Sequence, residues 1–190
     1  MRKNKIIAGV DEVGRGCLAG PVVSAAVILN KNIKIKDLKD SKKLNFNQRI
    51  KIAKDIKNNS FYSFGIATVK EIEKLNILNA SLLSMKRAIL NLSKKPNLVL
   101  IDGNFSPELP FECKTIIKGD EKIKCISAAS ILAKVHRDKI MIKMSKKFKN
   151  YFWSKNFGYG TKEHLLGLKK YGLTTMHRKN FKPIYKMLLK

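Results

Sequence analysis

The sequence predicts an α/β fold built as one domain. Short apolar runs that suit buried strands alternate along the chain with segments whose apolar residues recur at helical spacing. The 190 residues are the size of one domain, and the chain contains no internal repeat, low-complexity segment or linker. We therefore expect a single domain over residues 1–190, in which residues from about 160 to 190 form a helical C-terminal part.

The first half of the chain predicts three strands and two helices. Ile6–Val10 is an unbroken apolar run, typical of a strand buried on both faces, and a Gly-rich turn separates it from a Val- and Ile-rich strand over Pro21–Leu29. A helix with an Asn at its N-cap is expected over Asn45–Lys57, because apolar residues recur there at helical spacing. Phe61–Val69 alternates like a strand, and Ile77–Leu92 carries apolar residues along one helical face.

The second half of the chain predicts two short strands and then helices. Leu98–Ile101 is a buried strand, and Thr115–Ile117 follows a turn-rich segment as a second, shorter one. The longest helical pattern runs from Ile126 to about Phe148. Shorter helical patterns over Thr161–Tyr171 and Phe181–Leu189 complete the chain.

The chain is strongly basic. It contains 40 Lys and Arg against 14 Asp and Glu, for a formal net charge of +26 and a pI near 10.1. Such a surface attracts polyanions and makes nucleic acid the expected partner, although a coding bias toward Lys and Asn also contributes to the charge. The longest apolar stretch, Pro21–Leu29, is too short to span a membrane, and no signal peptide follows the basic start. We expect a cytoplasmic protein that does not associate with membranes.

Neither the cysteines nor the histidines have the spacing of a metal site. The three cysteines are odd in number and form no CxxC pair, so we expect them to be reduced and buried: Cys17, Cys113 and Cys125. The histidines lack ligand spacing to one another, and we expect each to lie at the surface or to contact phosphate: His136, His164 and His177.

Carboxylates follow two of the predicted buried strands. Asp11 and Glu12 come directly after the first strand, and Asp102 comes directly after the strand at 98–101. A carboxylate at the end of an apolar strand is costly unless it is paired or bound to a cation, and ligands of open α/β sheets sit beyond the carboxyl ends of strands. Carboxylates held together in this way favour Mg²⁺ or Mn²⁺. The alternative is that these acids only cap turns or helices.

The turn after the first strand is rich in glycine. Gly14 and Gly16 have the spacing that opens a dinucleotide loop, but the third glycine is Gly20, one position late, and the two acids before the turn would repel a pyrophosphate. A better interpretation is a turn whose bare backbone approaches a ligand while Arg15 reaches an anionic oxygen. A plain tight turn remains the alternative.

Two further residues are candidates for the site. Asp120 lies just before the longest predicted helix, where its carboxylate suits either a helix cap or a metal ligand. Tyr159 is flanked by glycines and followed by a lysine, so it could stack on a sugar or base while basic groups hold phosphates. The alternative for Tyr159 is a core tyrosine beside a turn.

Several blocks, taken in order, closely resemble the type 2 ribonuclease H family, which includes the bacterial ribonuclease HII. These blocks are Gly9–Val23, Asp40–Leu44, Leu100–Gly103, Lys118–Asp120, Ser127–Lys134, Gly158–His164 and His177–Phe181. The resemblance covers nearly the whole chain. Cys17 stands where many relatives have proline, and Asn180 stands where the family usually has serine. The related ribonuclease HIII carries an additional N-terminal domain, and because the first block begins at residue 9 we expect the HII type.

The resemblance implies a ribonuclease H-like fold, in which a mixed β-sheet is flanked by helices and followed by a helical C-terminal extension. It also implies two divalent metal ions, Mn²⁺ or Mg²⁺, held by the family's four acidic positions: Asp11, Glu12, Asp102 and Asp120. By the same resemblance Gly14, Arg15 and Gly16 read the 2′-hydroxyl at an RNA–DNA junction, and Tyr159 packs against the deoxyribose beyond it.

The implied activity is endonucleolytic cleavage of RNA in RNA–DNA hybrids. It includes incision 5′ to a single ribonucleotide embedded in duplex DNA, with 3′-hydroxyl and 5′-phosphate ends. We expect a monomer that binds hybrids and ribonucleotide-containing DNA, and a sliding-clamp contact through the C-terminal residues stays open beside a simple packed helix. The alternatives are a basic nucleic-acid-binding protein without catalysis, and another nuclease or recombinase on the same fold.

Overall fold

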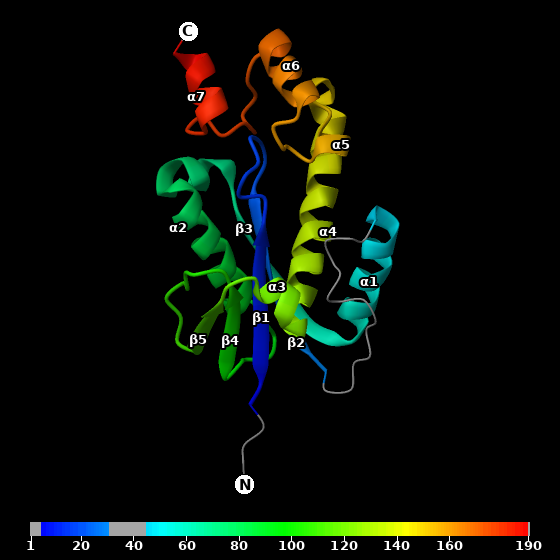
Figure 1. The fold of residues 1–190 in the computed structure, drawn as a ribbon, viewed down its shortest axis with the longest axis vertical. Coiled ribbons are helices and arrows are strands. Elements are labelled where there is room, and N and C mark those ends of the chain that lie inside the picture. Colours follow the sequence, from blue (N-terminus) through cyan, green and yellow to red (C-terminus); the bar gives the residue numbers. More distant parts are fainter. Residues whose placement is uncertain (1–4, 31–44, 190) are drawn as a thin grey trace.

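The computed structural model describes residues 5–30 and 45–189, which fold into a five-stranded sheet with helices on both faces (Figure 1). The block Asp40–Leu44 therefore lies outside the described residues. The strands are β1 (Ile7–Val13), β2 (Val22–Leu29), β3 (Ser60–Ala67), β4 (Leu98–Asp102) and β5 (Glu112–Ile116). The helices are α1 (Phe46–Asn58), α2 (Val69–Leu90), α3 (Gly119–Lys122), α4 (Lys124–Lys147), the 3₁₀ helix η2 (Lys149–Tyr151), α5 (Trp153–Asn156), α6 (Lys162–Tyr171) and α7 (Lys182–Leu188).

The sheet is mixed, as expected. Its strand order is β3-β2-β1-β4-β5. Strands β1, β2 and β3 form an antiparallel meander, whereas β4 and β5 run parallel to β1. Strand β1 is central and has neighbours on both sides, which agrees with its unbroken apolar sequence.

Different helices cover the two faces of the sheet. On one face Ala25 and Val27 of β2 pack with buried residues of α1 and α4, and on the other Ala26 packs with Met85 and Ile89 of α2. Alternate residues of a strand point to opposite faces, so this single strand contributes to both cores. In Figure 1, α4 runs along one side of β1 and α2 lies on the other.

Helix α2 begins earlier than the sequence pattern indicated. The expected helix from Ile77 is its second part, because Asn76 has a positive φ of 69° that interrupts the helix. The first part starts after Thr68, which forms a capping box with Glu71. The Thr68 hydroxyl accepts a hydrogen bond from the Glu71 N–H, and the Glu71 carboxylate accepts one from the Thr68 N–H. The prediction missed this part because residues 70–76 are mostly polar, and it extended the preceding strand to Val69 instead of ending it at Ala67.

Helices at the C-terminal end of the chain pack beyond the end of β1 (Figure 1). Trp153, Tyr151, Leu168 and Ile184 form a buried cluster with Leu18 and Ala19 of the glycine-rich turn. Helices α6 and α7 lie within two residues of the ends expected for them. This cluster fixes the glycine-rich turn from one side.

The expectation for the cysteines was only partly right. All three are free, but Cys17 alone is buried, whereas Cys113 and Cys125 are half-buried. Cys113 lies on the edge strand β5, and Cys125 lies in the first turn of α4. Within the described residues no helix combines the length and the apolar character that a bilayer crossing needs.

Candidate active site

The candidate site lies where two parallel strands end side by side. The parallel pairing of β1 and β4 runs up to Val10 and Ile101, and Asp11 and Asp102 are the next residue of each strand. The acids were expected just after the first strand. They lie within it instead, because β1 continues to Val13 through its pairing with β2.

Asp11 is buried, with 6% of its surface exposed. One of its carboxylate oxygens accepts a hydrogen bond of 2.7 Å from the Glu12 N–H. Burial raises the pKa of Asp11 well above its ordinary value, and the charges of Glu12 and Asp102 raise it further, against the effect of a hydrogen bond from Ser130. A carboxylate in this position favours a cation beside it.

Glu12 shares the same surroundings. Burial raises its pKa and the charge of Asp102 adds to the effect, whereas Arg15 lowers it through an ion pair of 3.3 Å. Arg15 itself lies near the surface, with 49% of its side chain exposed. The basic group of the turn therefore neutralises part of the acidic cluster.

Asp102 connects this pair to the fourth acid. One oxygen of Asp102 accepts a hydrogen bond of 2.6 Å from the Gly119 N–H, which brings the start of α3 against the end of β4. Asp120 is the next residue and is also buried. It belongs to the short helix α3 and not to the cap of α4, because the extended residue Ile123 separates the two helices.

Two hollows adjoin Glu12. One of about 330 Å³ is lined by Glu12, Ser130, Lys134, Arg49 and Tyr159 among others. The other, of about 70 Å³, lies between Glu12, Arg15 and Asp102. Tyr159, which is 38% exposed, therefore faces the same hollow as Glu12, and burial raises the pKa of its hydroxyl to about 12.

The two glycines of the turn differ in their surroundings. Gly14 has a φ of +98°, and a Cβ there would overlap the guanidinium end of Arg137, which packs against it. At Gly16 a Cβ would meet no atom within 4 Å. Only Gly16 therefore leaves open space into which a ligand can approach.

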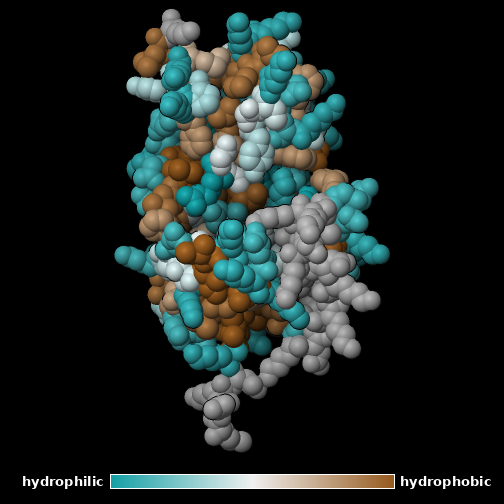
Figure 2. Space-filling model, in the orientation of Figure 1, coloured by the Kyte–Doolittle hydropathy of each residue, from teal (hydrophilic) through white to brown (hydrophobic). Residues whose placement is uncertain are grey.

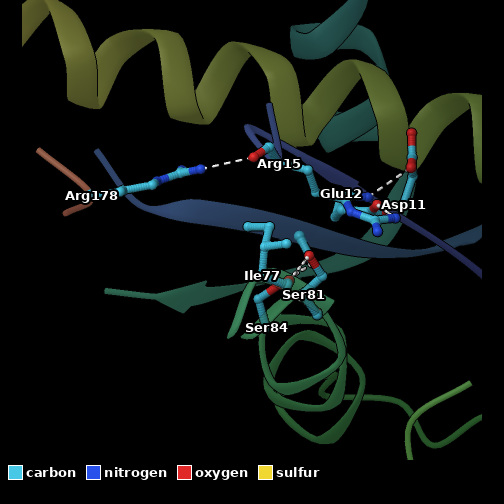
Figure 3. A network of polar contacts seen from close by, with 8 residues as sticks. Asp11, Glu12, Arg15, Ile77, Ser81, Ser84 and Arg178 are labelled. Carbon is cyan, nitrogen blue, oxygen red and sulfur yellow. Dashed lines mark hydrogen bonds and ion pairs between the residues drawn. The ribbon is translucent and has the colours of Figure 1, made fainter. Parts of the chain in front are cut away.

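Two arginines that the sequence patterns did not single out hold the turn. Arg137 donates to the carbonyls of Pro21 (2.9 Å), Ala19 (3.0 Å) and Phe157 (2.8 Å). Arg178 donates to the carbonyl of Arg15 at 2.9 Å, and the Arg15 side chain extends from there toward Glu12 (Figure 3). One sequence signal could have found them. Arg178 lies inside the block His177–Phe181 that resembles the ribonuclease H family, and Arg137 follows shortly after the block Ser127–Lys134.

The expectation for the histidines was wrong for two of the three. His164 and His177 are buried rather than at the surface, and their Nε2 atoms lie 3.1 Å apart. The Trp153 indole N–H donates to His164, and the Thr174 N–H donates to His177. Both rings are therefore bonded inside the protein and contact no phosphate in this arrangement. His136 is the more exposed one, and its ring stacks on Phe64 at 4.1 Å.

The donor set of the site suits a hard divalent cation. Its acidic side chains offer only carboxylate oxygens, and oxygen is the ligand atom that Mg²⁺ and Mn²⁺ prefer. Across residues 5–30 and 45–189, no three His, Cys, Asp or Glu side chains form a compact group that could hold a metal as they stand. The feature that would favour a cation is the buried Asp11, whose neighbours Glu12 and Asp102 are also acidic.

Comparison with solved structures supports this architecture. The ribonuclease H2 of Pyrococcus horikoshii OT3 superposes with a TM-score of 0.80 at 28% identity, covering 95% of this chain and 96% of that one. The RNase HII in a complex with PCNA from Archaeoglobus fulgidus gives a TM-score of 0.79 at 25% identity, over 93% and 95% of the two chains. These neighbours share the ribonuclease H-like fold.

Comparison with known sequences is more specific. The ribonuclease HII of Pelagibacter ubique (strain HTCC1062) is 60% identical over 185 residues, which cover 97% of this chain and 100% of that protein. The ribonuclease HII of Coxiella burnetii (strain Dugway 5J108-111) is 49% identical over 187 residues, 98% and 93% of the two chains. The family model for Ribonuclease HII matches residues 8–184, from the strand that carries Asp11 to the last helix. The chain therefore belongs to the ribonuclease HII family, a family of endoribonucleases that act on RNA–DNA hybrids.

Proposed function

We propose that this ribonuclease cuts hybrids and also incises duplex DNA 5′ to a single embedded ribonucleotide, leaving 3′-hydroxyl and 5′-phosphate ends. The observation that carries the proposal is that Tyr159 and Glu12 line one hollow, next to the buried Asp11 and the neighbouring Asp102. Gly16, in the turn that follows β1, leaves its side of that turn open.

The carboxylates are proposed as the metal ligands. Asp11, Glu12, Asp102 and Asp120 would hold two divalent ions, Mg²⁺ or Mn²⁺. When bound, two such ions activate a water and stabilise the leaving 3′-oxygen in an in-line displacement. The raised pKa of Asp11 and Glu12 supports this role, because a cation beside them would offset both the burial that mainly raises these values and the repulsion that adds to it.

The turn is proposed as the reader of the ribose. The 2′-hydroxyl distinguishes RNA from DNA at one nucleotide, and it both donates and accepts hydrogen bonds. Backbone groups of Gly14, Arg15 and Gly16 can meet both requirements, and the space beside Gly16 admits a sugar. Tyr159 would pack on the next sugar, a deoxyribose, across the hollow that it shares with Glu12.

Basic side chains around the acids would hold the phosphates. Arg49 and Lys134 line the hollow next to Glu12, and Arg15 stands on its other side. Hydrophilic side chains cover much of the face seen in Figure 2 and surround its apolar patches. With a net charge of +26, this surface favours duplex binding through release of counterions.

The test is an end-labelled DNA duplex with one ribonucleotide, incubated with the protein and Mg²⁺ or Mn²⁺. An all-DNA duplex and the Asp102→Asn protein serve as controls. We expect one cut 5′ to the ribonucleotide and none in either control. Loss in Asp102→Asn should be at least about a thousandfold, because a metal ion supplies several kcal/mol and each 1.36 kcal/mol is tenfold.

Other outcomes would change the proposal. Degradation of a long hybrid without a cut at the single ribonucleotide would remove junction reading and keep the nuclease. Cleavage of the all-DNA duplex would indicate a different nuclease on this fold. Full activity of Asp102→Asn would remove the carboxylate cluster from the mechanism.

We propose a sliding-clamp contact as a separate property. The similar Archaeoglobus protein is in a complex with PCNA. Here α7 packs through buried Ile184 and leaves Tyr185, Leu188 and Leu189 exposed. Replacing both leucines with Asp should weaken binding to the clamp of the same cell without changing cleavage, and unchanged clamp binding would exclude this surface.

A further inference from the structure

Two adjacent buried residues support both elements proposed to read the substrate, the glycine-rich turn directly and the Tyr159 segment through His164. His177 and Arg178 follow α6 and are 1% and 0% exposed. They join the glycine-rich turn through a β-bridge between Ala19 and His177, and through the Arg178 N–H, which donates to the carbonyl of Leu18 at 2.9 Å. A role for the pair in substrate reading rests on the function proposed above for that turn and for Tyr159.

Arg178 spans the turn from end to end. One terminal nitrogen of its guanidinium donates to the carbonyl of Arg15 at 2.9 Å, at the start of the turn. The Nε and the other terminal nitrogen both donate to the carbonyl of Gly20, at 3.0 and 2.8 Å, at the end of the turn. A planar, rigid fork of donors thus sets the distance between the two ends.

His177 reaches the Tyr159 segment through a second histidine. The Thr174 N–H donates to Nδ1 of His177 at 2.9 Å, so the ring proton of His177 is on Nε2. That proton is donated to Nε2 of His164 at 3.1 Å, where Trp153 also donates. The proton of His164 is then on Nδ1, and it is donated to the carbonyl of Tyr159 at 2.8 Å.

This arrangement requires both imidazoles to be neutral. His164 Nε2 and His177 Nδ1 are acceptors, and a proton on either would remove a hydrogen bond. Burial lowers the pKa of both rings, in agreement with the geometry. The chain of hydrogen bonds from His177 through His164 to the Tyr159 carbonyl is therefore intact at neutral pH.

The turn and the Tyr159 segment are joined directly by Arg137 and by the Leu18 N–H, which donates to the Gly158 carbonyl at 2.8 Å. We propose that His177 and Arg178 are positioning residues that hold these two joined elements at the spacing needed for a junction, and so determine preference for a single ribonucleotide in DNA. At a junction, one ribose must meet the turn while the next deoxyribose meets Tyr159. Inside a long hybrid every nucleotide of the RNA strand carries a 2′-hydroxyl, so the turn alone has many sites to engage. A change in spacing therefore affects the junction more than the hybrid.

Burial of a charged arginine here argues against a packing role alone. Taking a guanidinium out of water is costly unless its donors are satisfied, and an apolar side chain could fill the same volume. The C-terminal part already has an apolar cluster containing Trp153, Leu168 and Ile184. Arg178 adds a fixed geometry for the turn, which apolar packing does not supply.

The test compares three variants by a ratio of two activities. Arg178→Lys keeps the charge but cannot span both carbonyls, and His177→Phe keeps the ring beside Tyr151 (4.8 Å) and removes the donor. Ile184→Ala is the matched control, because it loosens the same buried cluster without removing a side-chain hydrogen bond. For each protein, kcat/KM on a duplex with one ribonucleotide is divided by kcat/KM on a long hybrid, which cancels any loss of folded enzyme.

We expect this ratio to fall at least about tenfold in Arg178→Lys and in His177→Phe, since small misplacements reduce rates by up to about a hundredfold. It should stay within about twofold of the wild type in Ile184→Ala. An unchanged ratio in Arg178→Lys, or an equal fall in Ile184→Ala, would overturn the positioning role. Wild-type protein that does not cut at a single ribonucleotide would instead refute the proposed function, and this inference with it.

Discussion

Alanine at Gly14 and alanine at Gly16 of the glycine-rich turn should have different consequences. Gly14 has a positive φ and its bare face touches Arg137, whereas Gly16 faces open space. We therefore expect Gly14→Ala to lower the stability of the fold. We expect Gly16→Ala to leave the stability unchanged and to reduce cleavage.

The expected destabilisation at Gly14 has two parts. A left-handed backbone costs an alanine about 1–2 kcal/mol. A Cβ would also overlap Arg137 Nε, with Cδ only 2.7 Å away, so Arg137 must leave one or more of its three carbonyl partners. Each hydrogen bond from a charged group contributes about 1.5–3 kcal/mol. The sum is about 3–5 kcal/mol, which lowers the Tm of a chain of this size by roughly 10 °C.

At Gly16 neither part applies. No neighbour lies within 4 Å of a new methyl group, and its φ is outside the left-handed range. The change in unfolding free energy should stay within about 0.5 kcal/mol. The methyl group would occupy the space proposed for the ribose, so cleavage should fall at least about tenfold, the loss that corresponds to about 1.4 kcal/mol.

Thermal unfolding followed by circular dichroism, with cleavage assayed well below both transitions, separates the two effects. If Gly16→Ala lowered the Tm as much as Gly14→Ala, the open side of the turn would be refuted. If Gly14→Ala kept the wild-type Tm within about 2 °C, the packing of Arg137 against the turn would be refuted instead.

Three further predictions concern the substrate and the buried histidines. Tyr159→Ala should weaken cleavage at a single ribonucleotide more than on a long hybrid, and equal losses would remove its role at the junction. Duplex affinity should fall about 10³–10⁵-fold between 50 and 200 mM salt if six to ten phosphates are contacted, and a flat titration would contradict the basic surface. Burial and the neighbouring His164 lower the pKa of His177 to about 4, so the unfolded state, with an ordinary value near 6.5, takes up the proton first. Stability should thus be full above pH 6.5 and fall by about 2–3 kcal/mol toward pH 4, and His177→Phe should flatten this part of a Tm–pH profile.

The sequence patterns predicted most of the sheet and the meeting of three acids. Acidic residues directly follow the apolar runs at 6–10 in β1 and 98–101 in β4, and the parallel pairing of these two runs places the acids side by side. Local pattern and a general rule of α/β sheets were enough for this step. The fourth acid, Asp120, could not be placed by pattern, because its position depends on the hydrogen bond between Gly119 and Asp102, 17 residues apart.

The supports of the turn could not be predicted in the same way. Arginine and histidine are polar residues that usually lie at the surface, so pattern favoured exposure for His164 and His177. Their burial is decided by partners far along the chain, such as the Gly20 carbonyl, which lies 158 residues from Arg178. The first part of α2 was missed although its signal is local. Its capping box lies in a segment with few apolar residues, so no helical apolar pattern marked the helix.

The need for these buried arginines arises from the turn itself. Residues 14–20 leave the sheet, so their carbonyls lose the partners that a strand would supply, and buried carbonyls require donors. Arg137 supplies Ala19 and Arg178 supplies Arg15 and Gly20, one from the long helix and the other from the C-terminal part. No atom lies within 4 Å of the Cβ position of Gly16, so this side of the turn is open for the proposed approach of a 2′-hydroxyl. We therefore expect the proposed reading of the substrate to need the C-terminal part, because this part fixes the turn that follows Asp11 and Glu12, the proposed metal ligands of β1.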